Sequence, residues 1–117
     1  MRYFDLLKKR AEERKRYLDN LDFYLKEIAE FFKEKLSDVK IYSFGSILTE
    51  GFDSESDIDI LVISPNTPPY LYQKAKLIAE LKTRIGFTNP FEIHLITPEE
   101  YKNWYSYFIK EKTEIKA

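Results

Sequence analysis

The chain has 117 residues, 44% of them apolar, which is enough for one domain with a real hydrophobic core. Its 19 basic and 20 acidic side chains nearly balance, so overall charge does not draw it to nucleic acid, and the absence of cysteine excludes disulfides, thiolate metal sites and cysteine nucleophiles. There is no apolar run of membrane-spanning length and no apolar signal core after Met1, so we expect a cytoplasmic protein with no membrane contact.

Residues 1–36 are expected to form a long N-terminal helical segment. Residues 2–36 contain neither glycine nor proline, and apolar side chains recur at helical spacing, with Arg14 as the gap in the stripe. One unbroken helix of this length would reach roughly 50 Å. Either it breaks near Asp19 and Asn20, or its first half projects as an arm that another copy of the chain or a partner can bind.

The first half of this segment also carries a cluster of basic residues between Lys8 and Arg16. Acidic residues interleave with them: Asp5, Glu12 and Glu13. This favours a solvated helix face with ion pairs one turn apart. The other interpretation is that this basic cluster binds RNA or an acidic partner.

The stretch from Ile41 to Ile63 predicts a strand, a tight turn at Gly45 and Ser46, a short helix, an acidic loop and a second strand. The first strand is expected over Val39–Phe44. The second continues past its acidic start as an apolar run, which is typical of a strand inside a sheet.

This stretch is locally acidic, because no Lys or Arg occurs between Lys40 and Lys74 while five carboxylates do: Glu50, Asp53, Glu55, Asp57 and Asp59. Such charge costs free energy unless a cation or a distant basic residue answers it. Asp57 and Asp59 point the same way on an extended chain, about 7 Å apart. Two carboxylates at that spacing can share one hard cation or hold two.

The turn before these acids suggests a phosphate site. Gly45 lets the backbone turn, and Ser46 at a helix N-terminus offers free N–H groups, a hydroxyl and the positive end of the helix dipole. The plainer alternatives are an ordinary strand-to-helix turn and a Ca²⁺ loop, and the second would leave Gly45 and Ser46 without a role.

A loop over residues 64–69 is followed by a helix, Tyr70 to Ile85, that stops at Gly86. The inner side of this helix is expected to consist of Leu71, Ala75, Ile78, Ala79 and Leu81. A capping box from Thr97 to Glu100 starts the last helix, expected from Pro98 to about Lys112, and the final residues are expected to fray. The side chains expected to turn inward from it are Trp104, Tyr105, Phe108 and Ile109.

The strand between these helices spans Pro90 to Ile96. Its alternation puts the apolar side chains Phe91, Ile93 and Leu95 on one face and Glu92 and His94 on the other. His94 is the only histidine, and it is either structural or a contact to substrate.

The sequence Phe44-Gly45-Ser46, then ten residues, then Asp57-Ile58-Asp59-Ile60 resembles the signature of the polymerase-beta-type nucleotidyltransferase superfamily. The resemblance is greatest to its minimal nucleotidyltransferases, which have a serine before the acidic pair, as Ser56 is here. It implies an α/β fold, a mixed sheet of three to four strands packed by helices, with a catalytic core over residues 39–112. Phe91-Glu92-Ile93 resembles the strand that bears the third acid.

By this resemblance the chain is a Mg²⁺-dependent nucleotidyltransferase that moves a nucleoside monophosphate, most simply AMP from ATP, to a hydroxyl of a protein or RNA. The implied metal-binding and catalytic residues are Asp57, Asp59 and Glu92, and the implied nucleotide-binding residues are Gly45, Ser46 and Ser56. Minimal nucleotidyltransferases often act as antitoxins beside a helical partner of the HEPN type, so such a partner is expected.

The chain departs from the superfamily pattern in having no basic residue in the motif region. A triphosphate carries several negative charges, so a distant Lys or Arg, or a partner protein, is expected to complete the site. The departure also favours a rival interpretation, a non-catalytic binding module that neutralises or scaffolds a partner protein by contact.

Overall fold

The computed structural model describes residues 2–45 and 57–117 of the chain. Its helices are α1 (Tyr3–Asp19), α2 (Leu21–Leu36), α3 (Leu71–Ile85) and α4 (Pro98–Asn103), with a 3-10 turn, η2, over Tyr105–Tyr107. Its strands are β1 (Lys40–Phe44), β2 (Ile58–Ile63), β3 (Phe91–Ile96) and β4 (Lys112–Glu114). Within these residues the strands form one sheet in the order β3-β2-β1-β4, with β2 and β3 parallel and the other pairs antiparallel. The predicted α/β class with a small mixed sheet is confirmed.

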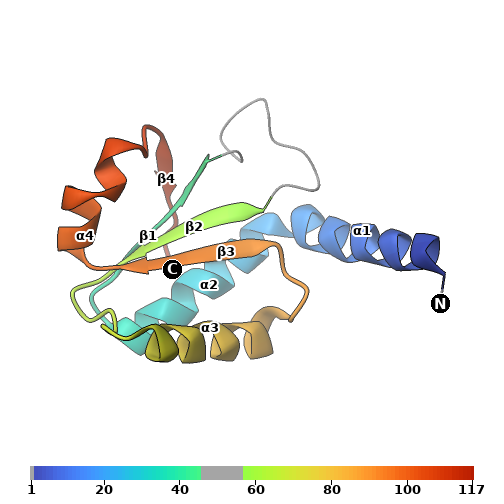
Figure 1. The fold of residues 1–117 in the computed structure, drawn as a ribbon, viewed down its shortest axis with the longest axis horizontal. Helices are drawn as coiled ribbons and strands as arrows, with labels where there is room; N and C mark the ends of the chain where they lie inside the picture. Colours follow the sequence, from blue (N-terminus) through green and yellow to red (C-terminus); the bar gives the residue numbers. More distant parts are fainter. Residues whose placement is uncertain (1, 46–56) are drawn as a thin grey trace.

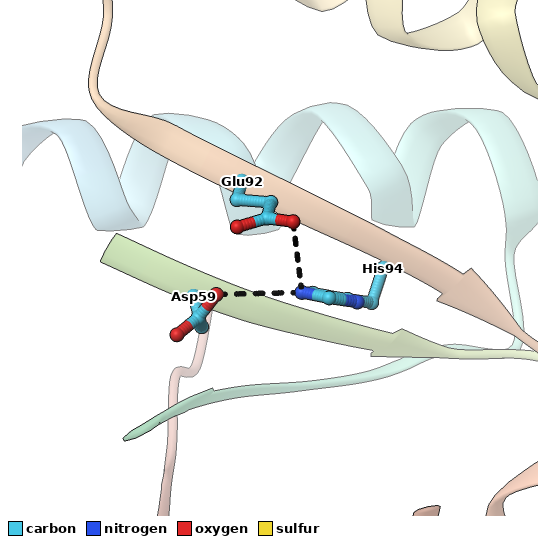
Figure 2. Close-up of side chains that lie close together, drawn as sticks. All are labelled: Asp59, Glu92 and His94. Atoms are coloured by element: carbon cyan, nitrogen blue, oxygen red, sulfur yellow. Dashed lines mark hydrogen bonds and ion pairs between the residues drawn. The ribbon is translucent and has the colours of Figure 1, made fainter. Parts of the chain in front are cut away.

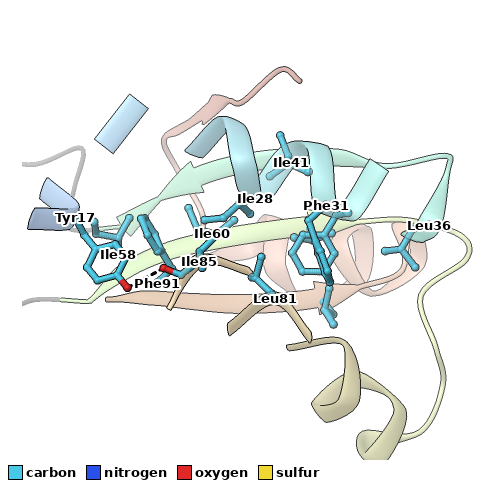
Figure 3. Close-up of a cluster of buried hydrophobic side chains, with 14 residues drawn as sticks. Tyr17, Ile28, Phe31, Leu36, Ile41, Ile58, Ile60, Leu81, Ile85 and Phe91 are labelled. Atoms are coloured by element: carbon cyan, nitrogen blue, oxygen red, sulfur yellow. Dashed lines mark hydrogen bonds between the residues drawn. The ribbon is translucent and has the colours of Figure 1, made fainter. Parts of the chain in front are cut away.

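One face of the sheet carries the main hydrophobic core. Figure 1 shows α2 and α3 on the same side of the strands, and Figure 3 shows the apolar side chains packed between them. Ile58, Ile60 and Val62 of β2 and Phe91 and Leu95 of β3 all point into this layer. Every second residue of a strand faces the same side, so the residues between them face away from the helices.

The opposite face of the sheet is covered only in part. A smaller cluster of Phe44, Leu61 and Ile96 packs there against tyrosines of α4 and η2, namely Tyr101 and Tyr105. Leu61 and its neighbours in β2 are fully buried on both sides of the sheet, as expected for an internal strand. The uncovered part of this face is where the polar residues of β2 and β3 lie.

The N-terminal helical segment is broken, as one of the two expectations had it. Asn20 separates α1 from α2, and its side-chain amide donates a hydrogen bond to the carbonyl of Arg16. α1 also extends past the end of the sheet in Figure 1, as the other expectation had it, while binding of another copy or a partner to this arm stays a prediction. Its outer end is exposed, including Phe4 and Leu7.

Tyr17 fixes the inner end of α1 to the rest of the fold. Its ring is fully buried, and its hydroxyl donates a hydrogen bond of 2.8 Å to the carbonyl of Ile85 at the end of α3. Gly86 follows with φ +114°, and a Cβ at that position would collide with the Tyr17 hydroxyl. Gly86 therefore ends α3, as predicted, and also leaves room for the anchor of α1.

The prediction for the C-terminus was partly wrong. The capping box at Thr97 is present, but α4 ends at Asn103, and the residues expected to fray include β4, which pairs with β1. Trp104 and Phe108 are exposed, whereas Tyr105 and Ile109 do pack inward. The helix cannot continue because Trp104 leaves the helical region of backbone conformation, with φ −136° and ψ −64°.

The inner side of α3 also differs from the prediction. Ile78 and Leu81 face the core as expected, but Leu71, Ala75 and Ala79 are exposed. The helix is rotated so that its larger side chains, which include Leu77 and Ile85, take the buried face, since they remove more apolar surface from water than alanine does. None of the helices in the described residues is long and apolar enough to cross a bilayer.

Candidate active site

Asp59 and Glu92 lie directly opposite each other in the parallel pair of β2 and β3. Their apolar neighbours Ile58 and Phe91 are also opposite each other and fix this register by facing the core. Both carboxylates consequently stand on the face opposite α2 and α3, which α4 and η2 cover only in part. Two acids that are 33 residues apart in sequence (92 minus 59) thus become neighbours.

His94 completes a cluster with these two acids (Figure 2). Its Nε2 lies 3.4 Å from Oδ1 of Asp59 and 3.9 Å from Oε1 of Glu92. One ligand atom from each residue falls within 4.8 Å of the others. Asp59 and His94 are about one quarter exposed and Glu92 about half, so the cluster is open to a ligand from one side.

The donor set of this cluster fits a divalent cation. Two carboxylates and one imidazole are ligands that such ions accept in proteins. Ligand oxygens around Mg²⁺ or Ca²⁺ lie about 2.0–2.6 Å from the ion, so a small inward movement of these side chains would enclose one. The cluster is also acidic on balance, which favours a cation over an anion.

Gly45 closes the edge of the cluster beside Asp59. It follows Phe44, which is the residue of β1 opposite Asp59, and it has φ +79°. A Cβ at this position would lie only 2.5 Å from Oδ2 of Asp59. Glycine is therefore required here twice, for the backbone conformation and for the approach of the carboxylate.

The ring of His94 is held between two aromatic side chains. Its centroid lies 5.2 Å from that of Phe44 and 6.0 Å from that of Tyr105. Burial, followed by the charges of Glu100 and Glu92, raises the pKa of Tyr105 above its usual value. The phenol stays protonated at neutral pH, so the aromatic support beside the acids adds no further negative charge.

Asp57 lies one residue before β2 and is not part of the cluster that the structure brings together. Its side chain is 61% exposed, and its Oδ1 lies 3.7 Å from Nη1 of Arg14 on α1. Two of the three predicted acids, Asp59 and Glu92, are therefore neighbours, while Asp57 pairs with an arginine. Ser46 and Ser56, the predicted nucleotide-binding serines, and the expected short helix and acidic loop lie outside the described residues.

Two residues of this region were absent from the predicted set of ligands and catalytic groups. His94 carried a usable signal, since it alternates with Glu92 on one strand face. Arg14 carried a weaker signal, because it is the one residue that interrupts the apolar stripe of the first helix. Only the folded chain shows that this interruption lies beside Asp57.

The family model of the nucleotidyltransferase domain matches residues 25–116, and the chain therefore belongs to this enzyme family. The chain is similar to a candidate nucleotidyltransferase of known structure, with a TM-score of 0.59 and 29% identity over 76% of this chain and 94% of the other. A second, from Sulfolobus solfataricus, has a TM-score of 0.58 and 19% identity over 90% and 85%, and it supports the fold alone. No curated protein matches the chain.

Proposed function

We propose that this nucleotidyltransferase moves a nucleoside monophosphate, AMP from ATP, to a hydroxyl group of a protein or RNA. The observation that carries the proposal is the cluster of Asp59, Glu92 and His94 beside the turn at Gly45. An acidic, half-open cluster next to a backbone turn suits a metal-bound polyphosphate, and membership of the family supplies the reaction class.

The proposed metal ligands are Asp57, Asp59 and Glu92, with Mg²⁺ as the ion. A divalent ion bound there would stabilise negative charge on the attacking and leaving oxygens. His94 lies within reach of the same position and joins the proposal as a further ligand. Arg14 then has to give up part of its contact with Asp57 when that carboxylate turns to the ion.

Glu92 is the proposed group that receives the proton of the acceptor hydroxyl. It is the most exposed member of the cluster, so an acceptor can reach it from solvent. The hydroxyl oxygen bonds to the α-phosphorus, the bond from that phosphorus to the bridging oxygen breaks, and pyrophosphate leaves. Gly45, Ser46 and Ser56 are the proposed contacts of the triphosphate.

The proposed partner is a helical protein of the HEPN type, with this chain as the antitoxin of a cytoplasmic pair, and pairing of two copies through α1 is the alternative use of the same surface. The exposed apolar side chains of α1, including Phe4 and Leu7, support a contact surface there. The rival function, a module that neutralises its partner by contact alone, draws on the same surface and needs no intact acids.

Transfer is tested with α-phosphate-labelled ATP, CTP, GTP and UTP, purified protein and Mg²⁺ in a cell lysate. Wild type is compared with the double variant Asp57→Asn, Asp59→Asn, and a matched control, Glu12→Gln with Asp22→Asn, removes two exposed helical acids. We expect a labelled macromolecule with wild type and the control only. Absence of label from folded wild-type protein with every nucleotide would overturn the proposal and favour the binding module.

A further inference from the structure

The nucleotide site of this chain needs a cation that its own motif does not supply. Between Lys40 and Lys74 the sequence contains no basic residue, although a nucleoside triphosphate brings several negative charges to the acids of β2. A divalent ion offsets only part of that charge. Lys110 lines an opening with Phe44 and Gly45. Another basic side chain at this end of the sheet comes from α1, where Nη1 of Arg14 lies 3.7 Å from Oδ1 of Asp57.

The position of Arg14 is set by the buried anchor of its helix. Tyr17 follows it by three residues, so the two side chains lie on the same face of α1. The Tyr17 ring packs edge-on against Phe91, with centroids 6.1 Å apart, at the start of β3. The next residue of β3 is Glu92, so the anchored part of α1 begins at the metal-binding end of the sheet.

Arg14 also shares an opening with a second arginine. An open cavity of about 220 Å³ is lined by Arg10, Glu13, Arg14 and Thr88. The two arginines are one helical turn apart, so their guanidinium groups approach the same opening. The side chain of Arg14 is only 20% exposed, whereas that of Asp57 is 61% exposed, so the arginine is the more enclosed member of the pair.

We propose that Arg14 binds the triphosphate of the incoming nucleotide, with Asp57 holding its guanidinium in position until nucleotide and metal arrive. The inference rests on the proposed function and deepens it, since it assigns a phosphate contact. A planar guanidinium with paired N–H donors matches phosphate oxygens. The family match begins at residue 25, so this contact comes from a helix outside the matched segment.

The test compares Arg14→Gln, Arg14→Lys and wild type by steady-state transfer and by calorimetric binding of a non-hydrolysable ATP analogue with Mg²⁺. Lys15→Gln is the matched control, because it removes the same charge one residue along, where Lys15 is exposed and paired with Asp19. We expect Arg14→Gln to raise KM and the analogue's Kd about tenfold or more, with a smaller change in kcat, and Arg14→Lys to recover part of this loss.

Three outcomes would overturn the role of Arg14. One is an unchanged Kd for the analogue in Arg14→Gln, and another is an equal rise in Lys15→Gln. The third is a fall in kcat at constant KM, which would mean that Arg14 acts only through Asp57. Transfer by wild type together with any of these leaves the proposed function standing. If wild type transfers nothing, the analogue's Kd still decides the role of Arg14, and Arg14→Lys serves if Arg14→Gln does not fold.

Discussion

At the residue scale, position 45 is the one where the structure most clearly requires a particular amino acid, glycine. Gly45 combines a left-handed backbone with a position where a Cβ would collide with the carboxylate of Asp59. We expect Gly45→Ala to lose about 1–2 kcal/mol of unfolding free energy from backbone strain alone. Displacement of Asp59 should lower transfer further, by tenfold or more.

Urea unfolding and steady-state transfer check this expectation. Since Gly51 is the remaining glycine of the motif region, Gly51→Ala is a useful comparison. An alanine at position 45 that leaves both stability and transfer intact would show that Asp59 can move without cost to the site.

His94 predicts a preference among metal ions. An imidazole nitrogen is a better ligand for Mn²⁺ and later transition metals than for Mg²⁺, which prefers oxygen. We expect wild type to bind Mn²⁺ more tightly than Mg²⁺, and His94→Gln to lose Mn²⁺ affinity about tenfold or more while Mg²⁺ affinity changes less. Electron paramagnetic resonance of free Mn²⁺, with Mg²⁺ as competitor, measures both.

The control for His94 is Tyr105→Phe, which leaves the aromatic ring that packs on the imidazole and removes only the hydroxyl. It should keep the metal preference of wild type. Equal losses of Mn²⁺ and Mg²⁺ affinity in His94→Gln would show that the imidazole supports the carboxylates and does not itself bind the ion.

At the scale of elements, one hydrogen bond inside the core contributes to the attachment of α1. Tyr17→Phe keeps the ring but leaves the carbonyl of Ile85 without its hydroxyl partner and removes the acceptor of an Arg16 N–H. We expect a loss of about 1–2 kcal/mol of unfolding free energy, measured by urea unfolding. Tyr3→Phe, at the exposed end of the same helix, should change it by less than about 0.5 kcal/mol.

The same variant tests whether α1 delivers Arg14 to the site. If Tyr17 positions this helix, Tyr17→Phe should also weaken binding of the ATP analogue, though less than Arg14→Gln does. A destabilised Tyr17→Phe with unaltered analogue binding would separate the two roles of α1.

Elements with strong local signals were predicted from sequence, and elements that depend on distant contacts were not. The end of α3 at Gly86 and the capping box at Thr97 depend only on residues close by in the sequence, and both are present. β4 has the sequence Lys-Thr-Glu, without apolar alternation, and exists because β1 offers it an edge. A local pattern cannot show such an edge, so the C-terminal helix was extended too far.

At the scale of the whole molecule, the two faces of the sheet have different roles. One face carries the hydrophobic core and packs against α2 and α3. The other face carries the acidic cluster, which lies between the turn at Gly45 and the residues of α4 and η2 that pack on this face. The alternation of β3 predicted the shared face of Glu92 and His94, whereas β2 was predicted only as an apolar strand inside a sheet. The position of Arg14 could not be predicted, because it depends on the angle at which α1 leaves the sheet.

The parallel pairing of β2 and β3 has a consequence for how the enzyme matures. His94 and Asp59 are 35 positions apart in the sequence, and the whole of α3 lies between them. In the unfolded chain these groups rarely meet, because closing so long a loop costs conformational entropy. A metal ion that binds this cluster, as proposed, would do so only after α3 and β3 have docked, and its binding free energy would add to the stability of the native state alone.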